Sequence, residues 1–252
     1  MHQEQTLISI ITPAYNAADY IAETIESVLG QSYQNWEMII ADDCSKDNTR
    51  DIINRFALED PRIRPVFLEV NSGAAAARNA ALKKAGGRYV AFLDSDDLWK
   101  PEKLDKQLAF MKLNQYAFTF TAYEMISEDG TPLHKLVDAP LEINYEKMLK
   151  NTIVGCLTVM IDLERTGSFE MPDIRTRQDL ATWLSILRRG HTAFGLNEVL
   201  AEYRTGNSSI SQNKWKAAKM NWFVYRKVEK LHLAKACWCF SNYAVHAVLK
   251  RF

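Results

Sequence analysis

Three aspartates follow a short apolar stretch before the middle of the chain. The segment reads Arg88-Tyr-Val-Ala-Phe-Leu-Asp94-Ser95-Asp96-Asp97. Residues 89–93 are apolar, which is long enough for one buried strand of a parallel sheet. Because clustered carboxylates repel one another and resist desolvation, three of them at the end of a buried strand indicate a cationic partner.

A divalent metal is the simplest such partner, since hard cations prefer carboxylate oxygens. Asp94 and Asp96 would share one side of an extended segment, because alternate residues of a strand point the same way. These residues also allow a different interpretation, in which the acids form a solvated turn that caps the next helix. Aspartate is a frequent N-cap, and Pro101 suits a helix start.

The segments that would position these acids alternate between strand and helix. Apolar runs predict four strands, at 7–11, 36–41, 63–70 and 89–93. The first strand is expected to stop at Thr12-Pro13. Helical spacing and capping residues predict helices at 16–30, beyond Asn48, at 74–85 and at 101–114. This alternation is typical of an α/β fold, a parallel sheet with helices on both faces.

Polar residues follow each of these strands, and ligands of such sheets bind beyond the carboxyl ends of the strands. We therefore expect one crevice that contains residues 13–16, Asp42-Asp43, 71–73 and 94–97. Beyond Gln115 the pattern is mixed. It predicts strands at 116–126 and 152–161, a helix at 180–188 and short strands near 192–204.

Composition is that of an ordinary soluble globular protein, with 47% hydrophobic and 25% charged residues. The four cysteines have no metal or disulfide spacing, which favours a reducing compartment. The five histidines show no ligand spacing. No signal peptide and no spanning helix are predicted, since the chain has neither a leader pattern nor 18 uninterrupted apolar residues.

Charge is unevenly distributed, although the net charge is zero. Segment 214–252 contains nine basic residues and one acid, a net charge of +8, and residues 1–213 therefore carry −8. The tail interleaves its cations with Trp, Phe and Tyr, a mixture that suits an interfacial helix on an anionic membrane surface. The other interpretation is that the aromatic side chains pack on the core. Nucleic acid is not an expected partner, because residues 1–213 are acidic and contain no nucleic-acid motif.

Five motifs stand in order along the chain: Ser9–Asn16, Ile39–Asp47, Asn71–Gly73 with Ala77-Arg78-Asn79, Phe92–Trp99 and Arg177–Trp183. In this combination the chain resembles family 2 glycosyltransferases of the GT-A fold, over roughly residues 6–213. The resemblance is nearest to bacterial enzymes that build surface polysaccharides. It implies a glycosyltransferase domain at 1–213, with a nucleotide-sugar-binding half at 1–114, an acceptor-binding half at 115–213 and a basic aromatic helical tail at 214–252.

The resemblance implies a UDP-sugar donor and Mn²⁺ or Mg²⁺ as cofactor. Asp43 would read uracil by accepting its N3 proton, with Asp42 as the alternative reader or as a structural neighbour. Asp96 is the implied metal ligand, and Asp97 is expected to cap the following helix. The residues implied in nucleotide-sugar binding are Pro13, Tyr15, Asn16, Asp43, Arg78, Asp94, Ser95 and Arg204.

Some of these donor-side residues have structural interpretations as well. Tyr15 could be a core aromatic residue and Arg78 a surface ion-pair partner. Arg204, with Ser208, Ser209 and Lys214, would belong to a flexible loop that closes over the diphosphate, or to an ordinary solvated loop.

Asp179 is the implied general base, and one base opposite the leaving group implies a single displacement with inversion. Gln178 stands where the family more often has Glu, which affects the acceptor side. Asp179 could instead cap helix 180–188.

The implied acceptor is a lipid-linked or oligosaccharide glycan, and the implied location is cytoplasmic, peripheral on the inner face of the bacterial plasma membrane. A catalytically silent sugar-nucleotide-binding regulator is the alternative, since it would keep Asp43 and Asp96 without needing Asp179.

Overall fold

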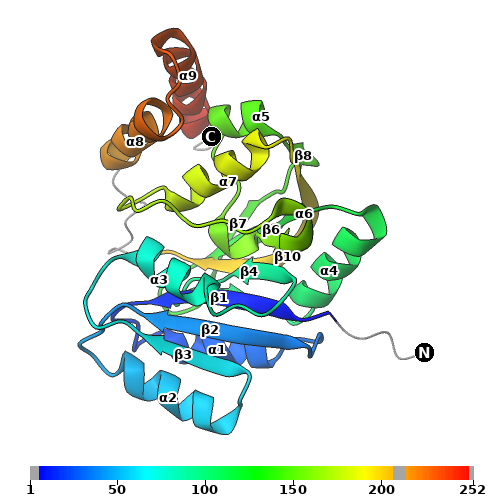
Figure 1. The fold of residues 1–252 in the computed structure, drawn as a ribbon, viewed down its shortest axis with the longest axis vertical. Helices are drawn as coiled ribbons and strands as arrows, with labels where there is room; N and C mark the ends of the chain where they lie inside the picture. Colours follow the sequence, from blue (N-terminus) through cyan, green and yellow to red (C-terminus); the bar gives the residue numbers. More distant parts are fainter. Residues whose placement is uncertain (1–5, 207–213, 250–252) are drawn as a thin grey trace.

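Four parallel strands form the first half of a large mixed sheet in the computed structural model, which describes residues 6–206 and 214–249 (Figure 1). They lie in the order β3-β2-β1-β4, with helices between them along the chain. The strands are β1 (Ile8–Ala14), β2 (Trp36–Asp42), β3 (Ile63–Phe67) and β4 (Tyr89–Phe92). The helices are α1 (Ile21–Leu29), α2 (Thr49–Glu59), α3 (Ala74–Leu82) and α4 (Lys103–Asn114). The predicted α/β architecture is confirmed.

The second half extends the same sheet in the order β9-β6-β10-β5, with β7 paired to β6 and β8 to β10. β9 is antiparallel to β4 and β6, whereas β10 is parallel to β6, so this half is mixed as predicted. Its strands are β5 (Leu98–Trp99), β6 (Phe118–Ile126), β7 (Pro132–Val137), β8 (Glu142–Ile143), β9 (Met160–Asp162) and β10 (Ala193–Arg204). Its helices are α5 (Tyr145–Lys150), α6 (Leu163–Thr166) and α7 (Gln178–Arg188).

The sheet separates two hydrophobic clusters, because successive strand residues point to opposite faces. Ile11 of β1 joins a cluster with α3, α5 and α7, while Ile8 and Ile10 join another with α1, α2 and α4. β4 divides in the same way, with Phe92 in the first cluster and Leu93 after it in the second. Both faces of the central strands are therefore buried, as their continuous apolar sequence predicts.

The tail consists of α8 (Lys214–Phe223), a π-helix (Val224–Val228) and α9 (Leu233–Leu249). Val224, Tyr225, Ala236 and Cys239 are buried in the cluster that contains α5 and α7. Tyr225 also donates its hydroxyl hydrogen to the Leu149 carbonyl at 2.5 Å. The packing interpretation is thus confirmed for this inner side. No helix among the described residues is long and apolar enough to cross a membrane.

Four strand predictions are wrong in their boundaries. The strand expected at 63–70 ends at Phe67. β1 continues to Ala14 instead of stopping at Thr12-Pro13. The Ile11 carbonyl points toward β4 and accepts a hydrogen bond from the Leu93 amide. Pro13 lies two residues further along β1 and faces the same way, but β4 has already ended there. The missing amide hydrogen of Pro13 therefore costs no hydrogen bond of the sheet. The strand expected at 152–161 is a 3₁₀ turn (Cys156–Thr158) followed by β9. The short strands expected near 192–204 form the single strand β10, which contains bulges.

Three predicted helix starts are also wrong. The helix expected from residue 101 begins at Lys103. The helix expected from Asn16 begins at Ile21, because Asn16 has left-handed backbone dihedrals (φ 49°) and residues 17–20 form a turn. The helix expected at 180–188 begins at Gln178, directly after Arg177, which is also left-handed (φ 66°). Asp179 therefore lies within the first turn of α7 rather than at its N-cap.

Candidate active site

The acidic segment is a tight turn between β4 and β5, not an extended stretch. The Asp97 amide donates to the Asp94 carbonyl at 3.2 Å, so the expected shared face of Asp94 and Asp96 is wrong. Asp97 does not cap α4, which begins at Lys103. Its side chain is buried, and its Oδ1 accepts from the Arg204 amide at 2.8 Å.

Arg204 holds this turn from the end of β10. Its guanidinium donates to the Asp96 carbonyl at 2.8 Å, to the Glu128 carbonyl at 2.7 Å and to the Glu23 carboxylate at 2.6 Å. The Tyr20 ring lies 4.9 Å from the guanidinium carbon. The expected loop position of Arg204 is therefore wrong, and Ser208 and Ser209 lie outside the described residues. In this structure Arg204 positions the acidic turn. A direct contact between Arg204 and the sugar-nucleotide donor stays a prediction.

Arg78 connects the acidic turn to α7. It lies on α3, where Ala75, Ala77 and Ala81 are buried and allow close approach to the sheet. Arg78 is itself buried, and its guanidinium forms an ion pair with the partly exposed Asp94 carboxylate, so the alternative of a surface ion-pair partner is wrong. Burial alone would lower the pKa of Arg78, but the negative groups around it, Asp94 and Asp179 among them, outweigh burial and raise it. Donor-side and acceptor-side carboxylates thus lie within electrostatic range of one cation.

Asp96 is exposed at the turn, and Ser95 beside it is partly exposed. Desolvation by the surrounding protein, followed by the charge of Asp94, raises the pKa of Asp96 to about 6. Desolvation, Asp96 and Asp94 also raise the pKa of buried Asp97 well above its usual range, and its Oδ2 has no hydrogen-bond partner within residues 6–206 and 214–249. A cation at this turn would relieve both effects.

The donor set of the turn fits Mn²⁺ or Mg²⁺ bound together with a diphosphate. The described residues contain no cluster of three or more His, Cys, Asp or Glu that could hold a metal ion alone. Magnesium commonly takes only one or two carboxylates and completes its shell with phosphate oxygens and water. Asp96, with Asp94 as its neighbour, would hold such an ion.

Asp43 joins the ends of β1 and β2 to the start of α3. Its two carboxylate oxygens accept from the Ser72 and Gly73 amides, each at 2.7 Å, and its own amide donates to the Ala14 carbonyl. The carboxylate oxygens keep free lone pairs, so a hydrogen bond from uracil is compatible with this arrangement. Asp42, by contrast, accepts from Arg50 at 2.5 Å and from the Ser45 amide at 3.1 Å, the structural role expected of it.

The loops that follow β1 and β2 are tied together. The Asn16 amide donates to Ser45 Oγ at 2.9 Å, and Asn16 Oδ1 accepts from the Lys46 amide at 2.9 Å. Pro13 is buried at the end of β1, while Tyr15 is exposed, so the core interpretation of Tyr15 is wrong. Tyr15 directly follows Ala14, whose carbonyl accepts from the Asp43 amide, and its exposed ring is available to a ligand.

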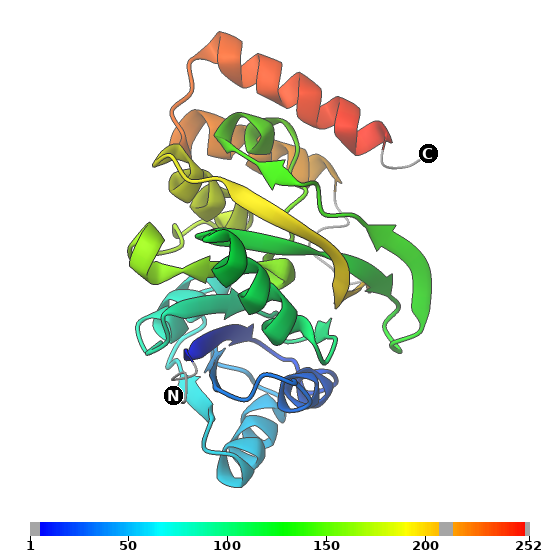
Figure 2. The same ribbon diagram turned by 90° about the vertical axis from the view of Figure 1, so that its right-hand side faces the viewer.

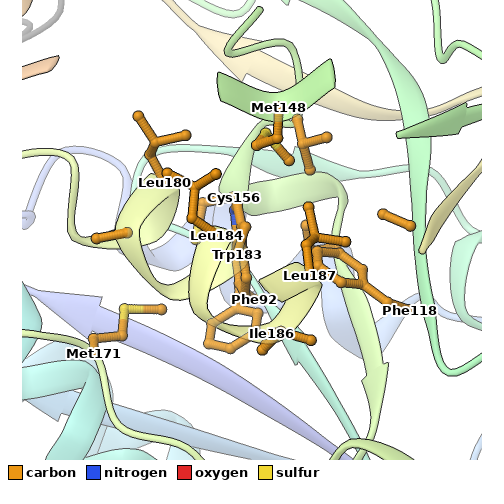
Figure 3. Packing of buried hydrophobic residues seen from close by; sticks show 14 of the residues in the cluster. Phe92, Phe118, Met148, Cys156, Met171, Leu180, Trp183, Leu184, Ile186 and Leu187 are labelled. Atoms are coloured by element: carbon orange, nitrogen blue, oxygen red, sulfur yellow. The ribbon is translucent and has the colours of Figure 1, made fainter. Parts of the chain in front are cut away.

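Asp179 is presented by a helix that packing holds in place. Trp183 lies between Phe92 and Phe118, with ring centroids at 5.3 and 5.4 Å, and α7 buries Leu184 and Leu187 in the same cluster (Figure 3). Asp179 itself is partly exposed. Among the residues that the structure describes, none donates a hydrogen bond to its carboxylate. A partly exposed carboxylate without a hydrogen bond, on a firmly packed helix, is suited to accept a proton from a substrate hydroxyl.

Two residues have positioning roles that were not predicted, although one of them, Asn79, belongs to the third motif. Asn79 Nδ2 donates to the Met171 carbonyl and Asn79 Oδ1 accepts from the Met171 amide, each at 2.8 Å, which fixes the segment before α7. Glu23 pairs with Arg204 across 181 positions of sequence. No local sequence signal could identify either partner, because the contacts depend on the tertiary fold.

Comparison with known proteins agrees with this geometry. The sequence model of Glycosyl transferase family 2 matches residues 9–172, and the chain belongs to that family. Its enzymatic class is therefore glycosyltransferase, and its fold is of the GT-A type. Asp179 lies just beyond the matched residues.

Two relatives are similar over nearly their whole length. TuaG of Bacillus subtilis, assigned as a teichuronic acid biosynthesis glycosyltransferase, is 63% identical, with 97% of each chain covered. The Escherichia coli enzyme WfgD, a UDP-Glc:alpha-D-GlcNAc-diphosphoundecaprenol beta-1,3-glucosyltransferase, is 42% identical, with 97% of this chain and 94% of WfgD covered.

Two solved structures share the fold at low sequence identity. Staphylococcus aureus TarS in complex with UDP-GlcNAc is 19% identical with a TM-score of 0.70, covering 94% of this chain and 71% of that one. The mannosyltransferase PcManGT of Pyrobaculum calidifontis, in complex with GDP-Man and Mn²⁺, is 18% identical with a TM-score of 0.69. That match covers 96% of this chain and 74% of the other.

Proposed function

We propose that this glycosyltransferase moves a sugar from a UDP-sugar to a hydroxyl of a lipid-linked bacterial surface glycan, with inversion at the anomeric carbon. The observation that carries the proposal is the packing of α7, the helix that bears Asp179, against β4: the Trp183 ring contacts the ring of Phe92, two residues before Asp94, at 5.3 Å between centroids. The candidate donor-binding turn and the candidate base therefore converge on one place, as a single displacement requires.

The residues of this site would divide the work. Asp43 would accept a hydrogen bond from the uracil N3–H, and the Pro13–Asn16 loop with the exposed Tyr15 ring would border the nucleoside. Asp94, Ser95 and Arg78 would orient the ribose and diphosphate, with Asp96 as the metal ligand. Asp179 would remove the proton of the acceptor hydroxyl as the new glycosidic bond forms and the UDP leaves. Mn²⁺ or Mg²⁺, when bound, supplies positive charge that stabilises the departing diphosphate.

The relatives support this substrate class. WfgD carries a UDP-glucose donor and a diphosphoundecaprenol-linked acceptor in its name, TuaG carries teichuronic acid biosynthesis, and TarS has been solved with UDP-GlcNAc. By analogy, the acceptor of this chain is a lipid-linked glycan, and the protein works in the cytoplasm on the inner face of the plasma membrane.

The test is UDP release from a panel of UDP-sugars, with Mn²⁺ or Mg²⁺ and with a lipid-linked acceptor. We expect acceptor-dependent UDP release with at least one donor, and its loss on chelation of the metal. Metal-dependent donor binding without turnover on any acceptor would favour the silent regulator instead. Turnover that survives Asp96→Asn unchanged would contradict the metal assignment.

A further inference from the structure

Between Leu233 and Val245, the solvent-facing side of α9 carries no charged residue. Residues 233, 234, 237, 238, 241, 244 and 245 are exposed, and at helical spacing they share one side of the helix. Their side chains are Leu, Ala, Cys, Trp, Ser, Ala and Val. Leu233, Trp238 and Val245 are 60%, 63% and 56% exposed. An exposed apolar strip of this kind marks an interaction surface.

The opposite side of α9 fixes this orientation. Ala236 and Cys239 are fully buried, and the Phe240 ring packs edge-on against Trp222 of α8 at 5.6 Å. Lys235 pairs with Glu146 of α5 at 2.6 Å. The helix lies at one end of the long axis of the molecule, away from α2 (Figures 1 and 2). Its apolar strip therefore faces outward from a docked helix and is not a core side left uncovered by a loose tail.

We infer that this outer strip of α9 lies on an anionic lipid bilayer. An interfacial helix combines an apolar side with nearby cations that meet anionic headgroups. Lys219, Lys227 and Lys230 are exposed in the segment that precedes α9. Trp215 and Phe223, four residues to either side of Lys219 on α8, add exposed aromatic side chains of the kind found at membrane interfaces.

Charge favours a bilayer over a second copy of the chain. A symmetric dimer would place the same patch of each subunit against the other. Segment 214–252 has a net charge of +8, so such a pairing would oppose two strongly basic segments. An anionic headgroup layer complements the same charge.

The inner side of α9 also reaches the candidate active site. Arg177 Nη2 donates to Tyr243 Oη at 3.5 Å, and Arg177 is two residues from Asp179. A bilayer on the outer strip would lie one helix diameter, about 10 Å, from this contact. This part of the inference rests on the proposed function, because it brings the headgroup layer close to the base that would act on a lipid-linked acceptor.

The test measures sedimentation of the full chain with vesicles of phosphatidylcholine, with and without phosphatidylglycerol. We expect binding to the anionic vesicles, and a loss of at least about tenfold in the Trp238→Glu/Val245→Glu variant. The matched control is Leu58→Glu/Leu113→Glu, which places the same two charges on exposed leucines of α2 and α4. The control should bind vesicles like the unmodified protein.

Two further measurements keep the result interpretable. Thermal unfolding should be unchanged in both variants, since all four side chains are exposed, and turnover with a short soluble acceptor should persist in both. Vesicle binding can therefore be absent, which contradicts the membrane inference, while turnover with the soluble acceptor still supports the transferase proposal. Equal vesicle binding by the two variants would overturn the inference. So would unchanged vesicle binding together with a dimer that only Trp238→Glu/Val245→Glu dissociates.

Discussion

The donor side and the acceptor side of the candidate site hold their carboxylates by different means. On the donor side, Asp43 and Asp94 each engage amides or an ion-pair partner. Arg204 fixes the acidic turn through its amide, which donates to Asp97, and its guanidinium, which donates to the Asp96 carbonyl. On the acceptor side, Asp179 accepts no hydrogen bond from the described part of the chain, and packing of Trp183 anchors its helix. Groups that bind a fixed ligand are thus held by polar contacts, whereas the group that would move a proton keeps its carboxylate free.

The largest expected effect comes from the free carboxylate. Asp179→Asn should lower turnover by roughly 10³-fold, because it removes the proton acceptor while preserving size and helix packing. UDP-sugar affinity should stay within about twofold, since the donor contacts lie across the site. Steady-state kinetics with the lipid-linked acceptor, together with a donor-binding titration, measures both quantities. Asp173→Asn, an exposed neighbour in the segment before α7, is the matched control and should leave turnover unchanged.

A smaller effect is expected from the polar support of the donor side. Arg204→Ala should lower the free energy of unfolding by about 3 kcal/mol, because it removes a buried cation and its hydrogen bonds to the turn. Metal affinity should fall as well, since the turn loses the contact to the Asp96 carbonyl. Chemical denaturation and a Mn²⁺ titration test these outcomes. Glu23→Gln, at the exposed end of the same network, should cost less than about 1 kcal/mol.

A third prediction, which concerns stability and not turnover, involves Lys103, which is fully buried on α4. Its ammonium donates to Gln107 at 2.6 Å and lies 4.3 Å from the Trp99 ring centroid, and burial lowers its pKa to about 7. Because the unfolded chain keeps Lys103 protonated up to a pH of about 10.4, stability should rise with pH between about 7 and 10. Lys103→Met should remove that rise and add about 1 kcal/mol at pH 6. Denaturation curves across this range measure it, and an unchanged slope would contradict the assignment.

Local sequence patterns predicted the strands and helices of the first half because those strands are apolar throughout and are bounded by polar residues. They could not predict where β1 ends, since Pro13 is tolerated only because β4 is shorter. The site was predicted as a group, for the carboxyl ends of β1, β2 and β4 bring Asp43, Asp94 and Asp96 to one edge. The turn at residues 94–97 was not, because contacts with Arg204 decide its shape.

The second half of the sheet shows more clearly what local sequence patterns fail to predict. Segment 152–161 is as apolar as a strand, yet only Met160–Asp162 pairs, and Cys156–Thr158 packs as a 3₁₀ turn. Packing of this turn depends on partners far away in sequence, such as Trp99, whose Nε1 donates to the Leu157 carbonyl at 2.9 Å. The positioning roles of Asn79 and Glu23 were not predicted for the same reason, because their partners are distant in sequence.

The division of labour between the two sides can be tested most directly by calorimetric titration of UDP into the protein with Mn²⁺. Asp96→Asn and Asp179→Asn should be compared with the unmodified chain in the same buffer at pH 7.5. We predict that Asp96→Asn loses the metal-dependent part of UDP binding, while Asp179→Asn retains it in full. Metal-dependent binding that survives in Asp96→Asn, or that disappears in Asp179→Asn, would contradict the assignment of Asp96 to the donor side and Asp179 to the acceptor side.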